Sequence, residues 1–366
     1  MNLGVIEVRR ARLRFGLLTA AVGLLVFLIV FLSSLSGALL RSLTGALESL
    51  PADGLVYAEA ARANVQGSRL DPATTEQVAG VPDVAEASPM SVLTVTATVA
   101  GQPDALTLIG VTPDSPGQPA GLREGRFPSD PGEVAVDASE AEIAVGDAIR
   151  VNGMSSDLVV TGRMVGTQLG ADTAWLSTEG YQQVLGELSP EVESVPINAV
   201  AFSVAAGADP ARVAEQVQEV VPGTQALTLP AAVDAIPGVE SIGRTFGLLV
   251  GITFVIGVVV VGFFFLILTV QKLRTFTLLR AVGASTRALA MTVVSQITIV
   301  VVLASAVATL LAWGALQAMS AGLPVAIDPL TTAGVVAAVL VASLAAGILS
   351  VRRIARIDPA SAAGAR

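Results

Sequence analysis

The sequence predicts an α-helical membrane protein with four transmembrane helices and a mixed α/β extracytoplasmic domain inserted between helices 1 and 2. Hydropathy is the first reason. The 366 residues are 53% hydrophobic, the mean hydropathy is +0.72, and the apolar residues gather in long segments. Charge is the second reason. Residues 51–238 contain 25 acids and 7 basic residues, whereas the rest of the chain contains 14 basic residues and 5 acids.

Lys and Arg residues that flank membrane spans mark the cytoplasmic side. Twelve of the 14 basic residues outside the acidic part form three clusters at the ends of apolar segments: Arg9, Arg10, Arg12 and Arg14; Lys272, Arg274, Arg280 and Arg287; Arg352, Arg353, Arg356 and Arg366. We therefore expect both termini in the cytoplasm and the acidic domain outside.

Three regions follow from this pattern. Residues 1–50 are expected to form a basic amphipathic lead and transmembrane helix 1, and residues 51–238 the extracytoplasmic α/β domain. Residues 239–366 are expected to form transmembrane helices 2–4, with a cytoplasmic coupling loop at 271–287 and a basic C-terminal tail.

The first apolar segment runs from Phe15 to about Leu40, which is too long for a signal peptide, so we expect an uncleaved helix. Leucines then recur every four residues, at positions 35, 39, 43 and 47. This spacing predicts that the helix projects beyond the bilayer until Pro51 ends it. The later spans are expected at 246–270, 288–318 and 330–349.

Within the acidic part, residues 92–101 and 105–111 alternate in polarity and predict a β-hairpin. Further short strands are expected in GEVAVD, DAIRVNG, DLVVTGRMVG and AVAFSVAAG. Three helices are expected after Asp or Ser caps, in DPATTEQVAGV, STEGYQQVLGEL and DPARVAEQVQEVV. The segment 119–131 is expected to be a loop.

The segment from Leu268 to Arg287 lies between two spans, contains the only lysine of the chain and has no acid. Its apolar residues recur at roughly helical spacing, which predicts a short amphipathic helix on the cytoplasmic surface. One interpretation is a charged turn that fixes topology. The other is a coupling helix through which a cytoplasmic motor moves the spans. The candidate ATPase-coupling residues are Lys272, Arg274, Phe276, Leu279, Arg280 and Gly283.

Composition excludes several kinds of chemistry. The chain has no Cys and no His, so disulfides, His-ligated metals and a Ser-His-Asp triad are all excluded. It has no GxxxxGK[ST] motif and cannot be a P-loop ATPase by itself. The predicted spans carry no Asp or Glu, which argues against a proton- or sodium-coupled carrier.

Three motifs carry a resemblance to a known family. They are LRAVGAS at 279–285, RRIARIDPASA with Asp358 and Pro359, and GLREGRFPSDPGEVAVD at 121–137. Together they resemble the FtsX/MacB-type ABC transporter permeases. The family commonly has Arg- and Glu-rich residues before its LRAxGAS loop, whereas this chain has LTVQKLRTFTL. That form, and the N-terminal RFGLLTAAVGLLVFLIVFLSSLSGAL, resemble the HrtB/DevC haem-exporter branch.

The resemblance implies a homodimeric permease in the plasma membrane of a bacterium, surrounded by lipids. It implies two copies of a separate ABC ATPase that bind ATP and grip the 272–287 loop and the N-terminal basic helix. ATP binding would close the dimer and move helices 1 and 2 with the outer domain. No catalytic residue, permanent cofactor or nucleic-acid partner is expected in this chain.

Three functions stay open: an efflux permease for haem or a similar amphiphile, an FtsX-like signalling permease for a cell-wall hydrolase, and a lipid, lipoprotein or peptide exporter. Haem as substrate needs an apolar slot, a cation for its propionates and an axial ligand. The candidates are Arg41, Glu48, Glu240, Arg244 and Met319, with Tyr57 as a further ligand. Glu48 is our first choice for the iron ligand because it ends the leucine series on the helix that bears Arg41. The competing interpretation is that these charges are ordinary interfacial ones.

Overall fold

A computed structural model describes residues 12–99, 102–137, 143–191, 195–271, 286–319 and 328–355. The chain divides into two compact units. One, here called the membrane unit, is built from the described residues of Met1–Gly37, Arg244–Ser320 and Val325–Arg366. The other, here called the α/β domain, comprises Ala38–Gly243.

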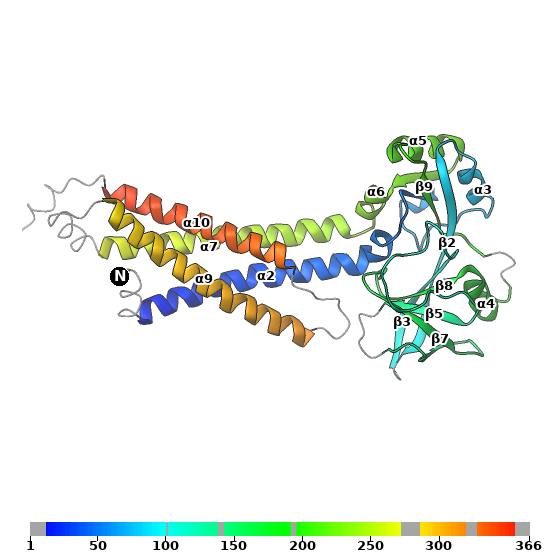
Figure 1. Cartoon of the computed structure of the whole chain (residues 1–366), viewed down its shortest axis with the longest axis horizontal. Helices are drawn as coiled ribbons and strands as arrows, with labels where there is room; N and C mark the ends of the chain where they lie inside the picture. Colours follow the sequence, from blue (N-terminus) through cyan, green and yellow to red (C-terminus); the bar gives the residue numbers. More distant parts are fainter. Residues whose placement is uncertain are drawn as a thin grey trace, which may run out of the picture. The chain divides into compact units, whose positions relative to one another are not determined.

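Four long helices supply the membrane unit (Figure 1): α2 (Arg12–Glu48), α7 (Val239–Gln271), α9 (Thr286–Met319) and α10 (Pro329–Ala355). Within the described residues, three stretches are long and apolar enough to cross a membrane: Phe15–Glu48, Val239–Phe264 and Val294–Ala318. The described apolar part of α10, Pro329–Ala345, is shorter. The first three predicted spans are therefore supported by length and composition, and the fourth stays a prediction.

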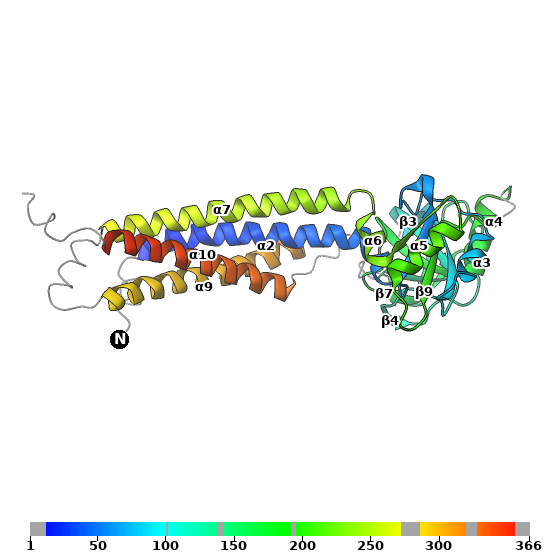
Figure 2. The same ribbon diagram turned by 90° about the horizontal axis from the view of Figure 1, so that it is seen from above.

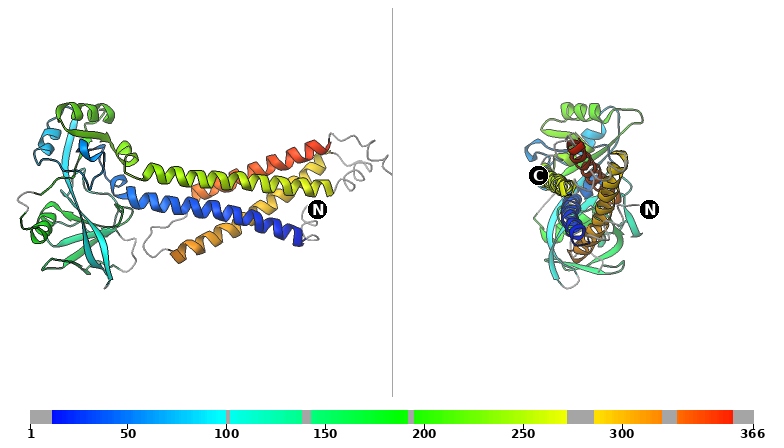
Figure 3. Two further views of the ribbon diagram at one scale, coloured as in Figure 1. Left: turned by 180° about the vertical axis from the view of Figure 1, so that it is seen from behind. Right: turned by 90° about the vertical axis from the view of Figure 1, so that its left-hand side faces the viewer.

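The membrane unit is held together by apolar packing between α2 and α9. Val22, Val26 and Val30 of α2 form one buried cluster with Val301 and Ala304 of α9, to which α7 and α10 also contribute. Figures 1 and 3 show α9 crossing α2 obliquely. Gly23 of α2 faces Ala304 of α9, and a Cβ added at Gly23 would be in ordinary contact, 3.5 Å, with the carbonyl oxygen of Ala304. Figure 2 shows α7 running beside α2 in the same unit.

Ten strands in the described part of the chain form one sheet, in the order β10-β1-β9-β2-β3-β8-β5-β7-β4, and β6 pairs with both β2 and β7. The pairs β3–β8 and β5–β7 are parallel and the others are antiparallel. The bounds are β1 (Gly54–Ala58), β2 (Val84–Val99), β3 (Gln102–Val111), β4 (Leu122–Gly125), β5 (Glu133–Asp137), β6 (Ala148–Val151), β7 (Leu158–Met164), β8 (Asp172–Ser177), β9 (Ala199–Val204) and β10 (Thr224–Thr228).

Six of these strands close into a ring, because the pairs run β2–β3–β8–β5–β7–β6 and back to β2. Alternate side chains of the ring strands form one buried cluster, which includes Leu108, Val136, Val160 and Leu176. Helix α4 (Thr178–Leu188) adds Val184 to this cluster. The ring is therefore a small filled barrel.

The strands β9, β1 and β10 continue the sheet beyond the ring, and short helices cover one side of this extension. Helix α5 (Pro210–Val220) packs Val213 and Val217 against Val200 and Phe202, and α3 (Thr74–Ala79) adds Val78. The opposite side carries a separate cluster, in which Leu55, Trp175 and Ala201 contact residues of α2 and α6 (Leu229–Asp234). Both segments that connect the domain to membrane helices therefore pack on the same apolar cluster.

Local signals in the sequence account for much of this architecture. Ser177 caps α4 by accepting the N–H of Gly180 at 3.1 Å, and Asp209 caps α5 by accepting the N–H of Ala211 at 3.1 Å. The predicted hairpin is present as β2 and β3. The predicted loop at 119–131 differs, because it contains β4, whose four residues are all exposed. An exposed edge strand lacks the alternation by which strands are recognised.

Candidate functional site

The last turns of α2 are hydrogen-bonded to two loops of the α/β domain. One loop, 165–170, follows β7, and the other, 119–121, precedes β4. Three backbone bonds of 2.7 to 2.8 Å make the connection: Ala46 N–H to Gln168 O, Gly170 N–H to Ser42 O, and Ala120 N–H to Ser49 O. The carbonyl of Ser49 is one that the helix end leaves without a partner in the helix, whereas Ala46 N–H and Ser42 O, four residues apart, bond to the loop and not to each other.

Gly45 is the point of closest approach between α2 and the 165–170 loop. A Cβ added at Gly45 would lie 2.6 Å from the carbonyl oxygen of Gly166 and 3.4 Å from the backbone nitrogen of Gln168. Both are backbone atoms, which cannot turn aside as a flexible side chain could. Only glycine lets this loop lie directly on the helix.

The 165–170 loop is itself fixed by buried polar groups. Asp137, at the end of β5, accepts the backbone N–H of Thr167 at 2.5 Å and its hydroxyl at 3.1 Å through Oδ2. The hydroxyl of Thr173 accepts the N–H of Leu169 at 2.9 Å. Residues Ala46 and Leu47 of α2 are buried in the apolar cluster beneath this loop. Helix α2 is therefore joined to the sheet both by hydrogen bonds and by the core.

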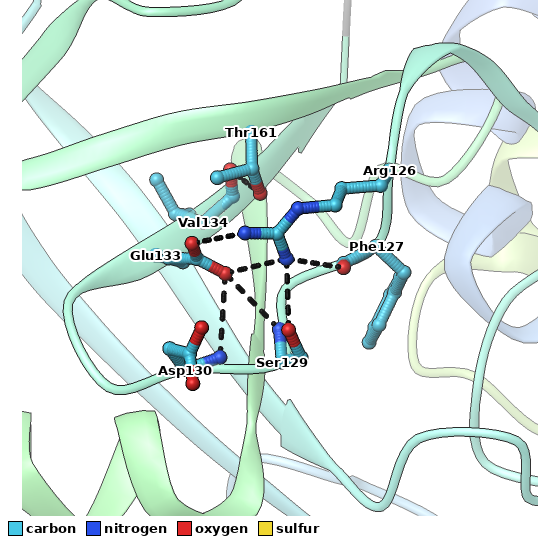
Figure 4. Close-up of polar contacts among 7 residues, drawn as sticks. All are labelled: Arg126, Phe127, Ser129, Asp130, Glu133, Val134 and Thr161. Carbon is cyan, nitrogen blue, oxygen red and sulfur yellow. Dashed lines mark hydrogen bonds and ion pairs between the residues drawn. The ribbon is translucent and has the colours of Figure 1, made fainter.

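The start of β5 is held by a polar turn (Figure 4). The guanidinium of Arg126 pairs with both carboxylate oxygens of Glu133 and donates to the hydroxyl of Ser129. The backbone N–H groups of Ser129 and Asp130 also point to Glu133 Oε2, at 3.2 and 3.3 Å. Burial raises the pKa of the Glu133 carboxyl, but these hydrogen bonds outweigh burial and hold that pKa below its usual value. This cluster has a structural role, because it anchors the strand that ends in Asp137.

Arg41 and Glu48, predicted as ligand-binding residues, both lie on α2 within the α/β domain. Nη2 of Arg41 is shielded from solvent and has no hydrogen-bond partner among the described residues. The side chain of Glu48 is exposed, and its Oε1 accepts the hydroxyl of Thr44 at 2.8 Å. Leu39 and Leu43, which belong to the predicted leucine series, are half-buried, whereas Leu47 is buried in the core.

The other candidates are placed differently. Glu240 and Arg244 are exposed in the first turns of α7, and each takes part in further polar interactions. Met319 is the last residue of α9, and its side chain lies outside the described part. Tyr57 is fully buried in the core of the α/β domain, and burial raises the pKa of its hydroxyl. The suggestion of Tyr57 as a ligand is therefore wrong, since no ligand at the surface can reach it.

The predicted ATPase-coupling residues lie outside the described residues, which end before this loop at Gln271 and resume at Thr286. They are Lys272, Arg274, Phe276, Leu279, Arg280 and Gly283. Their coupling role stays a prediction. The N-terminal basic residues up to Arg10 lie outside the described part as well.

The membrane unit contains an apolar groove between α2 and α9, with a volume of about 920 Å³. One face of α2, from Phe15 to Phe27, and one face of α9, from Leu303 to Ala315, line it. Thr19 is the one hydroxyl among the lining residues, and it donates to the carbonyl oxygen of Phe15 at 2.8 Å. The groove offers apolar contact and no charged lining group.

Sequence reasoning missed the joint at Gly45 and the loop that contacts it. A usable signal exists, because a glycine in the continuing helix costs stability relative to alanine and indicates a close approach. The partner loop, Gly166–Gly170, is bounded by two glycines that both have positive φ angles, of 73° and 78°. Nothing in the sequence indicates which helix such a loop contacts.

Two family descriptions match the chain. The MacB-like periplasmic core domain matches residues 15–220, and the FtsX-like permease C-terminal region matches residues 247–359. The first match alone includes more than half of the chain. The boundary between them falls near the start of α7, where the α/β domain ends.

Curated relatives agree with these matches. An uncharacterized ABC transporter permease of Mycobacterium bovis is 25% identical over 288 residues, which cover 79% of this chain and 77% of that protein. A Staphylococcus haemolyticus protein, named for a hemin transport system permease (HrtB), is 22% identical over 371 residues, covering 100% of this chain and 99% of that protein.

Solved structures add a distant likeness. The periplasmic region of MacB from Actinobacillus actinomycetemcomitans has a TM-score of 0.38 at 10% identity, covering 55% of this chain and 95% of that chain. The family assignment comes from the sequence matches, which extend from the first membrane helix into the C-terminal region. This chain belongs to the FtsX/MacB type of ABC transporter permeases.

Proposed function

We propose that this chain is the permease of an efflux transporter that exports haem or a similar amphiphile, driven by a separate ABC ATPase through movement of the membrane helices. The full-length similarity to a protein named for hemin transport supports the substrate class. In this proposal both termini lie in the cytoplasm, on the side of the ATPase, and α10 is the fourth membrane span.

The observation that carries the substrate proposal is the unpartnered guanidinium nitrogen of Arg41. A shielded cationic N–H without an acceptor is costly, and an anionic ligand group would supply the missing acceptor. Arg41 lies 26 residues beyond Phe15, so a helical rise of about 1.5 Å per residue puts it roughly 39 Å along α2, past the hydrocarbon thickness of a bilayer. A propionate of a membrane-bound porphyrin would meet it at this level.

Glu48 is the proposed iron ligand. It is the last residue of α2, where a carboxylate faces the negative end of the helix dipole. Its side chain is exposed, has no ion-pair partner among the described residues, and lies on roughly the same side of α2 as Arg41, one heptad earlier. The helix dipole disfavours a carboxylate at this end of α2, so a bound cation such as the haem iron would stabilise it. Arg244, Glu240 and Met319 are the remaining proposed contacts.

A homodimer is part of the proposal, and α7 supports it. Gly243, Gly247 and Gly251 recur every four residues along this helix, and a Cβ at any of them would meet no described atom within 4 Å. Large apolar side chains such as Leu248 and Phe263 are exposed on the same helix. Small residues at this spacing allow two membrane helices to approach closely.

Haem titration of the purified full-length chain tests the substrate class. We expect a Soret band that saturates with added haem in the wild type and that Glu48→Ala shifts or removes. Glu59→Ala, which removes an exposed carboxylate that follows β1 and is not part of α2, is the matched control and should leave the band unchanged. Cells that carry Glu48→Ala should become more sensitive to haem, while basal ATP hydrolysis by the complex survives.

If Glu48→Ala left the Soret band unchanged and its cells were as well protected from haem as the wild type, Glu48 would not be the iron ligand. Glu240 and Met319 would then be tested as ligands. Absence of any haem binding by the wild type would overturn the substrate class. The FtsX-like signalling permease would then be tested with a cell-wall hydrolase as partner, and the lipid or peptide exporter with labelled lipids.

A further inference from the structure

We propose that Thr44 is the positioning residue of the ligand site on α2: its hydroxyl holds one oxygen of the Glu48 carboxylate and leaves the other oxygen free for a bound cation. The inference rests on the proposed function, because it explains how the proposed iron ligand is arranged before haem binds. All the residues concerned lie in the last three turns of α2, within the α/β domain.

The hydroxyl of Thr44 lies between two acceptors. Its Oγ1 is 2.8 Å from Oε1 of Glu48 and 3.0 Å from the carbonyl oxygen of Leu40. A threonine hydroxyl carries a single proton, and a hydrogen bond to an ionised carboxylate is stronger than one to a neutral carbonyl. Thr44 therefore donates to Glu48 when that carboxylate is charged, and does not only bond back to its own helix as threonines in helices commonly do.

Thr44 is itself well fixed in the structure. Only 3% of its surface is exposed, whereas Glu48 is exposed. The next two residues of α2, Gly45 and Ala46, are the ones that the 165–170 loop contacts. A β-branched side chain in a helix also has few rotamers available. A fixed donor thus holds an exposed and otherwise flexible acceptor, which is how a preorganised ligand is built.

The second carboxylate oxygen of Glu48, Oε2, makes no hydrogen bond within the described part of the chain. It is therefore the oxygen that can bind a cation. A glutamate side chain that becomes ordered on binding loses rotamer entropy. Because Thr44 orders this carboxylate beforehand, less binding free energy is lost when the iron binds.

Thr44 also lies between the two opposite charges of this side of α2. Arg41, Thr44 and Glu48 are three and four residues apart, so they share roughly one side of the helix. Within the described residues, Arg41 and Glu48 form no ion pair, and Nη2 of Arg41 has no hydrogen-bond partner. A carboxylate held by Thr44 leaves both charges available to a ligand that carries a cation and an anion, as haem does in its iron and its propionates.

Haem titration of the purified full-length chain tests the role of Thr44. Thr44→Val keeps the shape of the side chain and removes the hydroxyl. We expect it to shift the Soret band and to raise the haem concentration at half-saturation roughly tenfold, the effect of one hydrogen bond to a charged group. Thr44→Ser keeps a hydroxyl and should restore both values.

Thr19→Val is the matched control. Thr19 lies on the same helix, and its hydroxyl donates to the carbonyl oxygen of Phe15 at 2.8 Å, but it bonds to no acid in the described part of the chain. The control therefore removes the same kind of bond within the helix and should bind haem as the wild type does. If Thr44→Val bound haem as tightly as Thr19→Val, Thr44 would have no positioning role.

The effect of Thr44 has to pass through Glu48. In a chain that already carries Glu48→Ala, Thr44→Val should weaken haem binding no further, which a double-mutant cycle measures. A further loss of affinity in this background would mean that Thr44 acts on the site by general destabilisation, and would overturn the proposal.

The hydrogen bond is also tested without haem, by thermal unfolding of the haem-free chain. Thr44→Val should lower the unfolding midpoint by about 2 °C more in the presence of Glu48 than in the Glu48→Ala background. Equal changes in the two backgrounds would overturn the proposal. A wild type that shows this difference but binds no haem would contradict the proposed function and not the hydrogen bond, so the two failures are distinguishable.

Discussion

The backbone carbonyl of Asp53 accepts the N–H of Leu229 at 2.8 Å, which joins the segment that leaves α2 to the first residue of α6. The side chain of Asp53 reaches a third segment, because its Oδ2 accepts the N–H of Val204 at 2.8 Å. One residue thus ties the two connections of the α/β domain to strand β9. Removing its side chain should therefore weaken the α/β domain where the chain enters the sheet after α2 and where it leaves it before α7.

Asp53→Ala removes the acceptor for Val204 but keeps both backbone bonds of residue 53. We expect the α/β domain to lose about 1 kcal/mol of unfolding free energy, because a partly buried N–H is left without its partner. Hydrogen exchange measures it, since the amide of Val204 should exchange faster. Asp53→Asn keeps an oxygen acceptor and should lose less. Equal exchange in all three proteins would contradict the assigned bond.

Glu133 gives the domain a specific pH dependence. Its pKa is lowered in the folded protein, so its stabilising contribution is complete above the unfolded pKa of about 4.3 and is lost as the pH falls through the lower folded value. Glu133→Gln should flatten the acid side of the stability profile, as measured by denaturation from pH 6 downward to about pH 3. Glu215→Gln, at an exposed residue of α5, is the control. If Glu133→Gln lost stability at low pH as much as the wild type does, Glu133 would not be the source of the pH dependence.

The coupling role of the basic loop is tested by reversing its charges. Lys272→Glu together with Arg280→Glu should abolish the stimulation of ATP hydrolysis in the assembled complex, because both cations are predicted to face the ATPase. Arg62→Glu together with Arg123→Glu makes the same change in charge at exposed sites of the α/β domain and should preserve turnover. If the loop variant assembles and turns over normally, the loop does not couple.

Topology is tested with single cysteines. Ser129→Cys, at an exposed residue of the α/β domain, should react with an impermeant thiol reagent on whole cells. Ser285→Cys, in the predicted cytoplasmic loop, should react only after the cells are opened. The wild type supplies a clean background because it has no cysteine. If both cysteines were labelled on intact cells, the predicted orientation of the chain in the membrane would be wrong.

Patterns local to one segment predicted much of the fold. The leucine series and Pro51 indicated that the first helix continues past the bilayer, and α2 does extend to Glu48. The capped helices after Ser177 and Asp209 were also predictable. Strand β8 was missed, because a short apolar run such as DTAWLS does not show by periodicity whether it forms a strand or a helix.

Contacts between distant segments could not be predicted. The closure of the ring depends on the pairing of Ala97 with Val151, which no local pattern encodes. Arg41 and Glu48, one heptad apart, were predicted to lie on one helix, and the structure places both on α2. That Arg41 has a shielded nitrogen without a partner depends on how the helix meets the domain, and only the structure shows it.

The pairing of β1 with β9 and β10 also constrains the order in which the protein can be made. Gly54, just after α2, pairs with Phe202 and with Thr228, and Thr228 comes shortly before α7. During synthesis, α2 would be inserted long before the partners of β1 emerge, and contacts so distant in sequence form slowly. We expect a nascent chain that ends before residue 199 to expose an unpaired β1 edge, which makes this stage the one most dependent on chaperones.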